Sequence, residues 1–244
     1  MADVENTTLG RGDLYFMPEG ASGYDFIGNT PSFGLTVNTE YLKHFNSGRG
    51  VKTQDRETPV QTDYAGSFMT DNVTPKNLAN YFQGDTATIA VAGAVAVVET
   101  FVSVVKQGRY FVAKKNIATV IVKVGVTAKV LGTDYEVDAA RGMVTVLEAG
   151  TIAAGATIEV TYDVLAHSYK RTRSGASVKS GKLLFVAYNP EGDQTDYKLD
   201  DVKLSPAGEF AIKADEWQSL PFNIAISTPS GGYAITANGE PYTP

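Results

Sequence analysis

The chain contains no cysteine and only two histidines among its 244 residues. Without cysteine there can be no disulfide, no thiol nucleophile and no thiolate ligand for a metal, which fits assembly in a reducing cytoplasm. The histidines, His44 and His167, lie far apart in the sequence, and neither belongs to a metal-binding spacing such as HExxH. We therefore expect no metal and no other cofactor.

Long apolar runs are also absent. No stretch reaches the length of about 18 apolar residues that a membrane-spanning helix needs, and the opening Met-Ala-Asp-Val-Glu-Asn is too polar for a signal peptide. Hydrophobic residues still make up 43% of the chain and charged residues 20%, a balance typical of a chain that folds around a core. The sequence thus predicts a folded protein without a membrane partner.

Neighbouring carboxylates, Asp200-Asp201 and Asp215-Glu216, are the main candidates for catalysis. Paired acids can act as general acid and base in a cleft, but adjacent strand residues point to opposite faces of a sheet. A chain with 27 acidic residues also contains such neighbours by chance. We expect no enzymatic activity, and a hydrolase that uses these acids is kept as an alternative. The single tryptophan, Trp217, is expected to be a core or interface anchor.

The net charge of −6 is unevenly distributed along the chain. Residues 1–107 hold 12 acidic and 7 basic side chains, residues 108–182 hold 6 and 11, and residues 183–244 hold 9 and 3. The two ends thus share a sign that the middle opposes, which suggests one acidic body interrupted by an insert. An acidic body argues against a face that binds nucleic acid, because phosphates are bound by basic side chains.

The chain is organised around a hairpin between residues 33 and 68. Apolar and polar residues alternate over 33–41 and again over 60–68, the period-2 pattern of half-buried strands. Between them, 44–59 is polar and much longer than a hairpin turn requires, and we predict a loop there. A loop of that length in a compact domain is usually functional or disordered.

A short helix is predicted after the hairpin. Thr74 is a suitable N-cap, Pro75 suits the first helical position, and Gly84 suits the position after the C-cap. One apolar face, which we expect to lie on a sheet, is formed by Leu78, Tyr81 and Phe82.

The middle of the chain predicts a separate small β-sandwich. Short β-branched runs at 117–124, 143–147 and 158–164 are separated by glycine-containing turns, as in small sandwiches. We place this inserted domain at 108–166, so that 1–107 and 167–244 form the two parts of one outer domain. Further strands are predicted in the second part, among them 209–213 and 222–226. The predicted fold class is therefore mainly β, a β-sandwich or barrel with one flanking short α-helix plus the inserted sandwich.

Several segments resemble the major tail tube proteins of long-tailed bacteriophages of the siphophage type. They are Gly-Asn-Thr-Pro-Ser-Phe-Gly-Leu-Thr-Val at 28–37, Gly-Ser-Phe-Met-Thr-Asp-Asn at 66–72 and Pro-Lys-Asn-Leu at 75–78. A later stretch, from Gly-Lys-Leu-Leu-Phe at 181–185 to Ser-Pro-Ala-Gly-Glu-Phe at 205–210, is similar to the second half of that family. The likeness covers 30–85 and 180–227. The insert departs from it and looks like the immunoglobulin-like or fibronectin-like modules of phage structural proteins.

This resemblance implies a structural virion protein. Six subunits would close a ring, and stacked rings would form the hollow tail tube through which DNA passes into the host. The implied partners are further copies of the chain, the tape measure protein, and the tail terminator and distal tail proteins. Viral DNA would pass without specific binding. The implied location is the virion tail, assembled in the cytoplasm of the bacterial host.

The hairpin then receives two predicted roles. Its polar residues are expected to face the bore, because neutral and acidic side chains do not retain DNA: Thr36, Asn38, Glu40, Gln61, Asp63 and Ser67. Its loop is expected to contact the adjacent ring through charged residues: Arg49, Lys52, Asp55, Arg56 and Glu57.

A second interpretation comes from a different functional class. The insert alone is also consistent with a phage or bacterial β-sandwich binding module, either an adhesin or a decoration protein. Such a module would be a monomer with a ligand site, whereas a tube protein would form rings or tubes.

Overall fold

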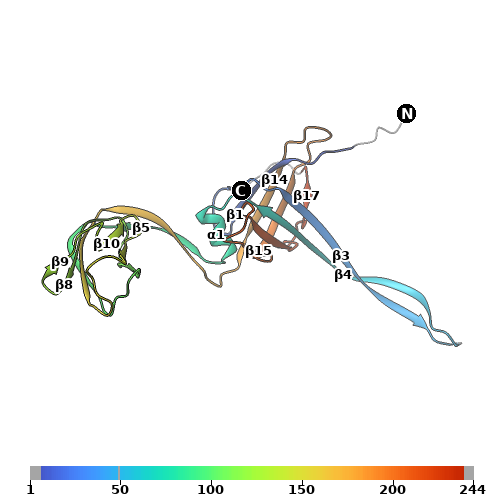
Figure 1. Cartoon of the computed structure of the whole chain (residues 1–244). Coiled ribbons are helices and arrows are strands. Elements are labelled where there is room, and N and C mark those ends of the chain that lie inside the picture. The colour runs from blue at the N-terminus through green and yellow to red at the C-terminus, as the bar shows by residue number, and fades with distance from the viewer. Residues whose placement is uncertain (1–6, 49, 239–244) are drawn as a thin grey trace. The chain divides into compact units, whose positions relative to one another are not determined.

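The computed structural model describes residues 7–48 and 50–238. These residues form a mainly β protein whose named strands pair antiparallel wherever their register is defined, with one short helix, and this confirms the predicted fold class. The chain divides into two compact units. The first contains residues up to Ala87 and from Thr172 onward, and the second is Thr88–Arg171. Figure 1 traces both along the chain.

The first unit is built on one large antiparallel sheet. Its strand order is β2-β1-β14-β15-β16-β4-β3, and β17 adds to β15. The elements of this unit are β1 (Gly12–Pro18), β2 (Asp25–Gly28), β3 (Ser32–Asn46), β4 (Thr53–Thr70), α1 (Pro75–Tyr81), β14 (Lys179–Ala187), β15 (Tyr197–Pro206), β16 (Leu220–Ile226) and β17 (Thr236–Ala237).

This sheet rolls up on itself. Its two edge strands, β2 and β3, are joined by only three residues, 29–31, and a connection of that length spans at most about 14 Å. The rings of Phe33 on β3 and Phe185 on β14 lie 5.6 Å apart. In a flat sheet these strands, four places apart, would be separated by about 19 Å. The sheet is therefore curled into a barrel-like form with a seam between its edges.

The core of the first unit lies inside this curl. Alternate residues of β16, Leu220, Phe222, Ile224 and Ile226, are buried, as the period-2 pattern over 222–226 predicts. Phe68 stacks on Phe222 at 4.8 Å between ring centroids. The buried side chains of β1, β14 and β15 complete one hydrophobic cluster, so a single core holds all the long strands of this sheet together.

The predicted loop at 44–59 is wrong. β3 continues to Asn46 and β4 begins at Thr53, so only 47–52 connect them. Two register shifts, at Glu40/Tyr41 and His44/Phe45, place extra residues of β4 opposite β3. These bulges break the polar–apolar alternation, and nearly all side chains here are exposed. A strand without a buried face has no period-2 signal, which is why this part resembles a loop in the sequence.

Helix α1 covers the sheet at β15 and β16. Thr74 is its N-cap, its side chain accepting from the backbone N–H of Asn77 at 3.2 Å, and Pro75 opens the first turn. We predicted that Gly84 follows the C-cap of this helix, but the left-handed residue is one position earlier. Gln83, with φ of 50°, occupies the left-handed position, while Gly84 N–H donates to the carbonyl of Ala79.

Gly84 is required for a different reason. A Cβ there would lie 1.7 Å from the carbonyl oxygen of Arg173, so only glycine permits this close approach of two backbones.

The second unit is a small β-sandwich. One sheet has the order β6-β12-β8-β9 and the other β10-β11-β7, and both contribute to one buried cluster. Its elements are β6 (Ala94–Phe101), β7 (Arg109–Phe111), β8 (Ile117–Val124), β9 (Thr127–Ala128), β10 (Tyr135–Asp138), β11 (Met143–Val146) and β12 (Ile158–Val164). Strict alternation buries Ile158, Val160, Tyr162 and Val164 of β12.

This unit begins earlier than the predicted insert of 108–166. It starts at Thr88 because β6 pairs along β12 and belongs to its sheet. The chain passes between the units through β5 (Asp85–Val91) and β13 (His167–Arg173), which pair with each other. The charge change at residue 108 thus falls inside the sandwich. It does not mark the start of the unit because β6, which comes before residue 108, is apolar and carries a single charge, that of Glu99.

The predicted strand at 209–213 is absent from the structure. Residues 207–219 between β15 and β16 are irregular. Phe210 lies against Tyr81 and Phe82, with ring centroids at 5.9 and 6.4 Å. Tyr81 Oη also donates to the carbonyl of Gly208 at 2.7 Å. Anchoring to α1 takes the place of strand pairing in this loop.

The N-cap of α1 provides a stability test. Thr74→Ala removes the acceptor for an N-terminal N–H and should lower the free energy of unfolding of the first unit by about 1 kcal/mol. Denaturant unfolding of the full chain measures this change. Ser22→Ala, at an exposed loop position, is the control and should change little. Equal effects of the two substitutions would contradict the capping role.

Candidate functional site

The distal part of the β3–β4 hairpin lacks a third strand. β16 pairs with β4 only over Tyr64–Thr70, and in the described residues β3 has β4 as its sole neighbour. We call residues 38–46 and 53–63 the hairpin arm. All of its side chains are exposed except the half-buried Thr39. Figure 1 shows it leaving the sheet of the first unit as a long two-stranded ribbon, coloured blue to cyan.

The six predicted bore residues share one face of this hairpin. Asn38 lies opposite Asp63 and Glu40 opposite Gln61, and Thr36 and Ser67 follow in the same phase. All six are exposed. Gln61 Nε2 donates to Asp63 Oδ2 at 2.7 Å. The register therefore brings these side chains together, whereas their position in an assembly stays a prediction.

The same polar face continues onto strands that the bore prediction missed. Asn223 pairs with Ser67, Ala225 with Ala65, and Lys203 of β15 with Ala225. These three residues are exposed. The alternation of buried and exposed residues over β16 could have revealed Asn223 and Ala225. Lys203 adds one positive charge to the face that carries Glu40 and Asp63, and farther out on the arm the register places Arg56 opposite His44 on this face as well.

The predicted inter-ring residues lie on the arm and its turn. Asp55, Arg56 and Glu57 are on β4 rather than in a loop, and Lys52 is in the turn. Arg49 lies outside the described residues. His44 Nδ1 contacts Asp55 Oδ1 at 2.5 Å, and Lys43 Nζ lies 4.0 Å from Glu57 Oε1. These pairs link the two strands across the exposed arm.

The opposite face of the hairpin carries an apolar stripe, which Thr39 and the Lys43–Glu57 pair interrupt on the arm. β3 carries no inserted residue at either bulge, so its odd positions stay on one face. Phe33 and Leu35 pack against the core. Farther out on the same face Val37, Tyr41 and Phe45 are 57%, 49% and 48% exposed. An apolar stripe therefore leaves the core and continues along the arm without a covering element among the described residues.

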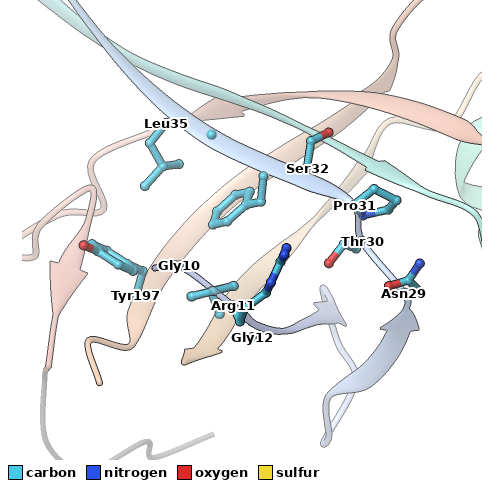
Figure 2. A pocket seen from close by; sticks show the side chains of 12 residues that line it. Gly10, Arg11, Gly12, Asn29, Thr30, Pro31, Ser32, Leu35 and Tyr197 are labelled. Atoms are coloured by element: carbon cyan, nitrogen blue, oxygen red, sulfur yellow. The ribbon is translucent and has the colours of Figure 1, made fainter. Parts of the chain in front are cut away.

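A cavity of about 610 Å³ lies at the seam of the sheet. Its walls are the segment Gly10–Gly12, the connection 29–31, the start of β3, and the rings of Phe185 and Tyr197. In Figure 2 the Arg11 side chain extends from the residue before β1 toward the side of Thr30, while Leu35 and Tyr197 are on the other side. The cavity thus combines aromatic and aliphatic side chains with the Arg11 guanidinium and the polar side chains of Asn29, Thr30 and Ser32.

Trp217 is not a core residue. It is 95% exposed, on the loop 207–219. Ile212 on the same loop is 76% exposed, and Gln218 Nε2 donates to the carbonyl of Ile212 at 2.8 Å. Of the two predicted roles only that of an interface anchor is compatible with this exposure.

The other candidates for chemistry do not form a site. The structure contains no cluster of three or more potential metal ligands in its described part. Asp200 lies 3.3 Å from Lys198 in an ion pair, and Asp215 and Glu216 are exposed. His167 lies in the β13 strand, its ring stacked near Tyr169 at 6.1 Å. In the described residues, no recorded hydrogen bond or ion pair joins Asp200, Asp201, Asp215 or Glu216 to either histidine.

Perturbed carboxylates occur in the second unit, where they fasten turns. Asp134 accepts the backbone N–H groups of Val130 and Thr151 at 2.8 and 2.6 Å, and these hydrogen bonds hold its pKa below the usual range. The Arg141 side chain lowers the pKa of Asp138 in the same way. Asp134 thus ties the loop before β10 to the loop after β11, and Asp138 fastens the turn between β10 and β11.

Comparison with known families gives one match. The model of a family described as "Protein of unknown function UCP028589" covers residues 7–229. The chain belongs to this family. A search of curated proteins found no match. The bounds of the match enclose both units and the hairpin. Within the described residues, no helix is long and apolar enough to cross a membrane.

The arm should be the least protected part of the large sheet. A two-stranded ribbon is marginally stable in water, so the amides of 53–62 should exchange hydrogen much faster than those of 64–70, which β16 also supports. Hydrogen exchange of the isolated subunit, followed by mass spectrometry, measures this difference. Similar protection of both segments in a verified monomer would contradict our account of the arm.

Proposed function

We propose that this protein is a structural subunit of a phage tail tube, in which rings of six copies stack into a hollow tube for DNA. The observation that carries the proposal is the hairpin arm, which leaves the core with both faces exposed. The resemblance of 30–85 and 180–227 to tail tube proteins supplies the type of assembly. The role proposed is therefore structural rather than catalytic.

The arm supports self-assembly on physical grounds. An apolar stripe with Tyr41 and Phe45 about half exposed costs free energy in water. The unpaired edge of β3, 15 residues long, is also a template for pairing with another chain. Packing against another copy would cover the stripe and satisfy the edge. A repeated contact of this kind generates rings and filaments.

The two faces of the arm receive different roles in this proposal. The face with Asn38, Glu40, Gln61 and Asp63 lines the bore, where neutral and acidic groups do not retain phosphates. The apolar face packs on neighbouring copies, and the tip with Lys52, Asp55, Arg56 and Glu57 contacts the next ring. Lys203 is expected to remain an isolated positive charge. The tape measure, tail terminator and distal tail proteins would be the further partners in the virion.

Electron microscopy of the purified protein tests the assembly. The full-length chain should form rings or tubes in negative stain. A shortened variant joins Leu42 to Thr58, which lie opposite each other, through Asn-Gly in place of 43–57. Asn-Gly favours the tight turn of a two-residue hairpin, so this variant should fold and remain unassembled.

A matched control preserves the length of the arm. Replacing only Ser47 and Val51 of the turn by glycine and serine should leave assembly largely intact, because the stripe, Lys52 and the paired strands remain. Full-length protein that stays monomeric at high concentration would contradict the proposal. A monomer that also binds a cell-surface ligand would support the adhesin or decoration alternative instead.

The bore can be tested by labelling, because the chain contains no cysteine. Asn38→Cys should react with a small maleimide in tubes but be protected from a bulky, protein-sized maleimide. Thr100→Cys, exposed on β6 of the second unit, is the control for general access. Equal labelling of Asn38→Cys by the bulky reagent in tubes and in dissociated subunits would place it outside the bore.

A further inference from the structure

The loop 207–219 carries an exposed segment, residues 212–217, which we call the knob. Trp217 is 95% exposed and Ile212 is 76% exposed, although tryptophan is buried to a large extent in most proteins. Its base is fixed by Phe210 against Tyr81 and by Tyr81 Oη on the carbonyl of Gly208. A tryptophan held outward on an anchored loop has the character of an interface hot spot.

The knob carries negative charge. Asp215 and Glu216 directly precede Trp217 and are exposed. The described residues contain no ion pair of either carboxylate. The sequence Asp-Glu-Trp thus combines an indole with two carboxylates, and the loop 207–219 keeps a net negative charge because Lys213 balances only one of its three acidic residues.

The seam cavity of the same unit has the complementary properties. Its volume of about 610 Å³ lies in the range of ligand pockets. Leu35, Phe185 and Tyr197 offer an apolar and aromatic lining. Arg11 supplies one positive charge at the wall, and within the described part of the chain it has no ion pair. An arginine in this position can contact both an indole face and a carboxylate.

We propose that Trp217 of one copy inserts into the seam cavity of a second copy, with Asp215 and Glu216 facing Arg11. The partner must be another molecule, since Trp217 is exposed in its own chain. Knob and cavity are different patches of one unit, so the contact is head-to-tail and can close a ring. This inference deepens the proposed function and rests on the self-assembly stated there.

The single tryptophan makes the contact directly observable. Emission of Trp217 should shift to shorter wavelength as the protein assembles, and quenching by iodide or acrylamide should fall. Trp217→Ala should weaken association at least about 30-fold in sedimentation or light scattering, as expected for a hot-spot tryptophan. Tyr233→Ala, at another exposed aromatic residue of this unit, is the control and should assemble normally.

A charge-reversal cycle identifies the cavity as the acceptor. Arg11→Glu should weaken association about tenfold, and so should Asp215→Lys combined with Glu216→Lys. All three substitutions together should restore most of the lost association. Additive losses without restoration would overturn the pairing of these residues. Circular dichroism and thermal unfolding of each variant verify that it is folded.

Failure of this contact differs from failure of the proposed function. If rings or tubes form while Trp217 emission stays that of an exposed indole, the inserted tryptophan is overturned and the tube proposal stands. If neither association nor an emission shift occurs at high concentration, both are overturned. If deletion of residues 1–6 is required for the emission shift, the chain's own N-terminus fills the cavity, and this result also overturns the inference for the intact protein.

Discussion

The structure of the first unit depends on how far its central strands support the long hairpin. β16 pairs with β4 from Tyr64 to Thr70 and no farther, while β3 and β4 continue for many residues beyond this point. Inside the supported part, one face of the hairpin is buried and a single core forms. Outside it, the same two strands have only each other. This limit creates both the stable unit and its exposed arm.

The closing of the sheet follows from the same hairpin. Because β3 begins three residues after β2, the hairpin brings one sheet edge back to the other. The seam between them leaves a cavity lined by Phe185, Tyr197 and Arg11. We propose assembly roles for three surfaces. The hairpin arm is an extension of the sheet, the seam cavity is a gap between its edges, and the third surface is the loop that carries Trp217.

The sequence predicts those parts in which one face is buried. The alternation of β12 and β16, the boundaries of β8 and the N-cap at Thr74 are all readable from local patterns. The distal hairpin was missed because neither of its faces is buried and two bulges interrupt the register. The start of the second unit was missed because β6 is joined to it by pairing with the distant β12, which no local pattern or charge change reports.

Candidate surfaces were less predictable than the fold. The polar phase of the hairpin was found by its period, and the register places its six residues on one face. The seam cavity is formed by segments far apart in the sequence, around residues 11, 33, 185 and 197, and thus has no sequence signature. The exposure of Trp217 depends on Phe210 packing on α1, a tertiary contact that composition cannot reveal.

The central claim is that the arm is completed by other copies of the same chain. A cryo-electron microscopy map of the protein purified at high concentration tests it most directly. Our account predicts a hollow ring or tube in which the apolar face of β3 packs on a neighbouring copy and the face of Asn38 and Asp63 lines the bore. Dispersed monomers with a solvated arm, or an assembly that leaves the arm outside its contacts, would contradict it.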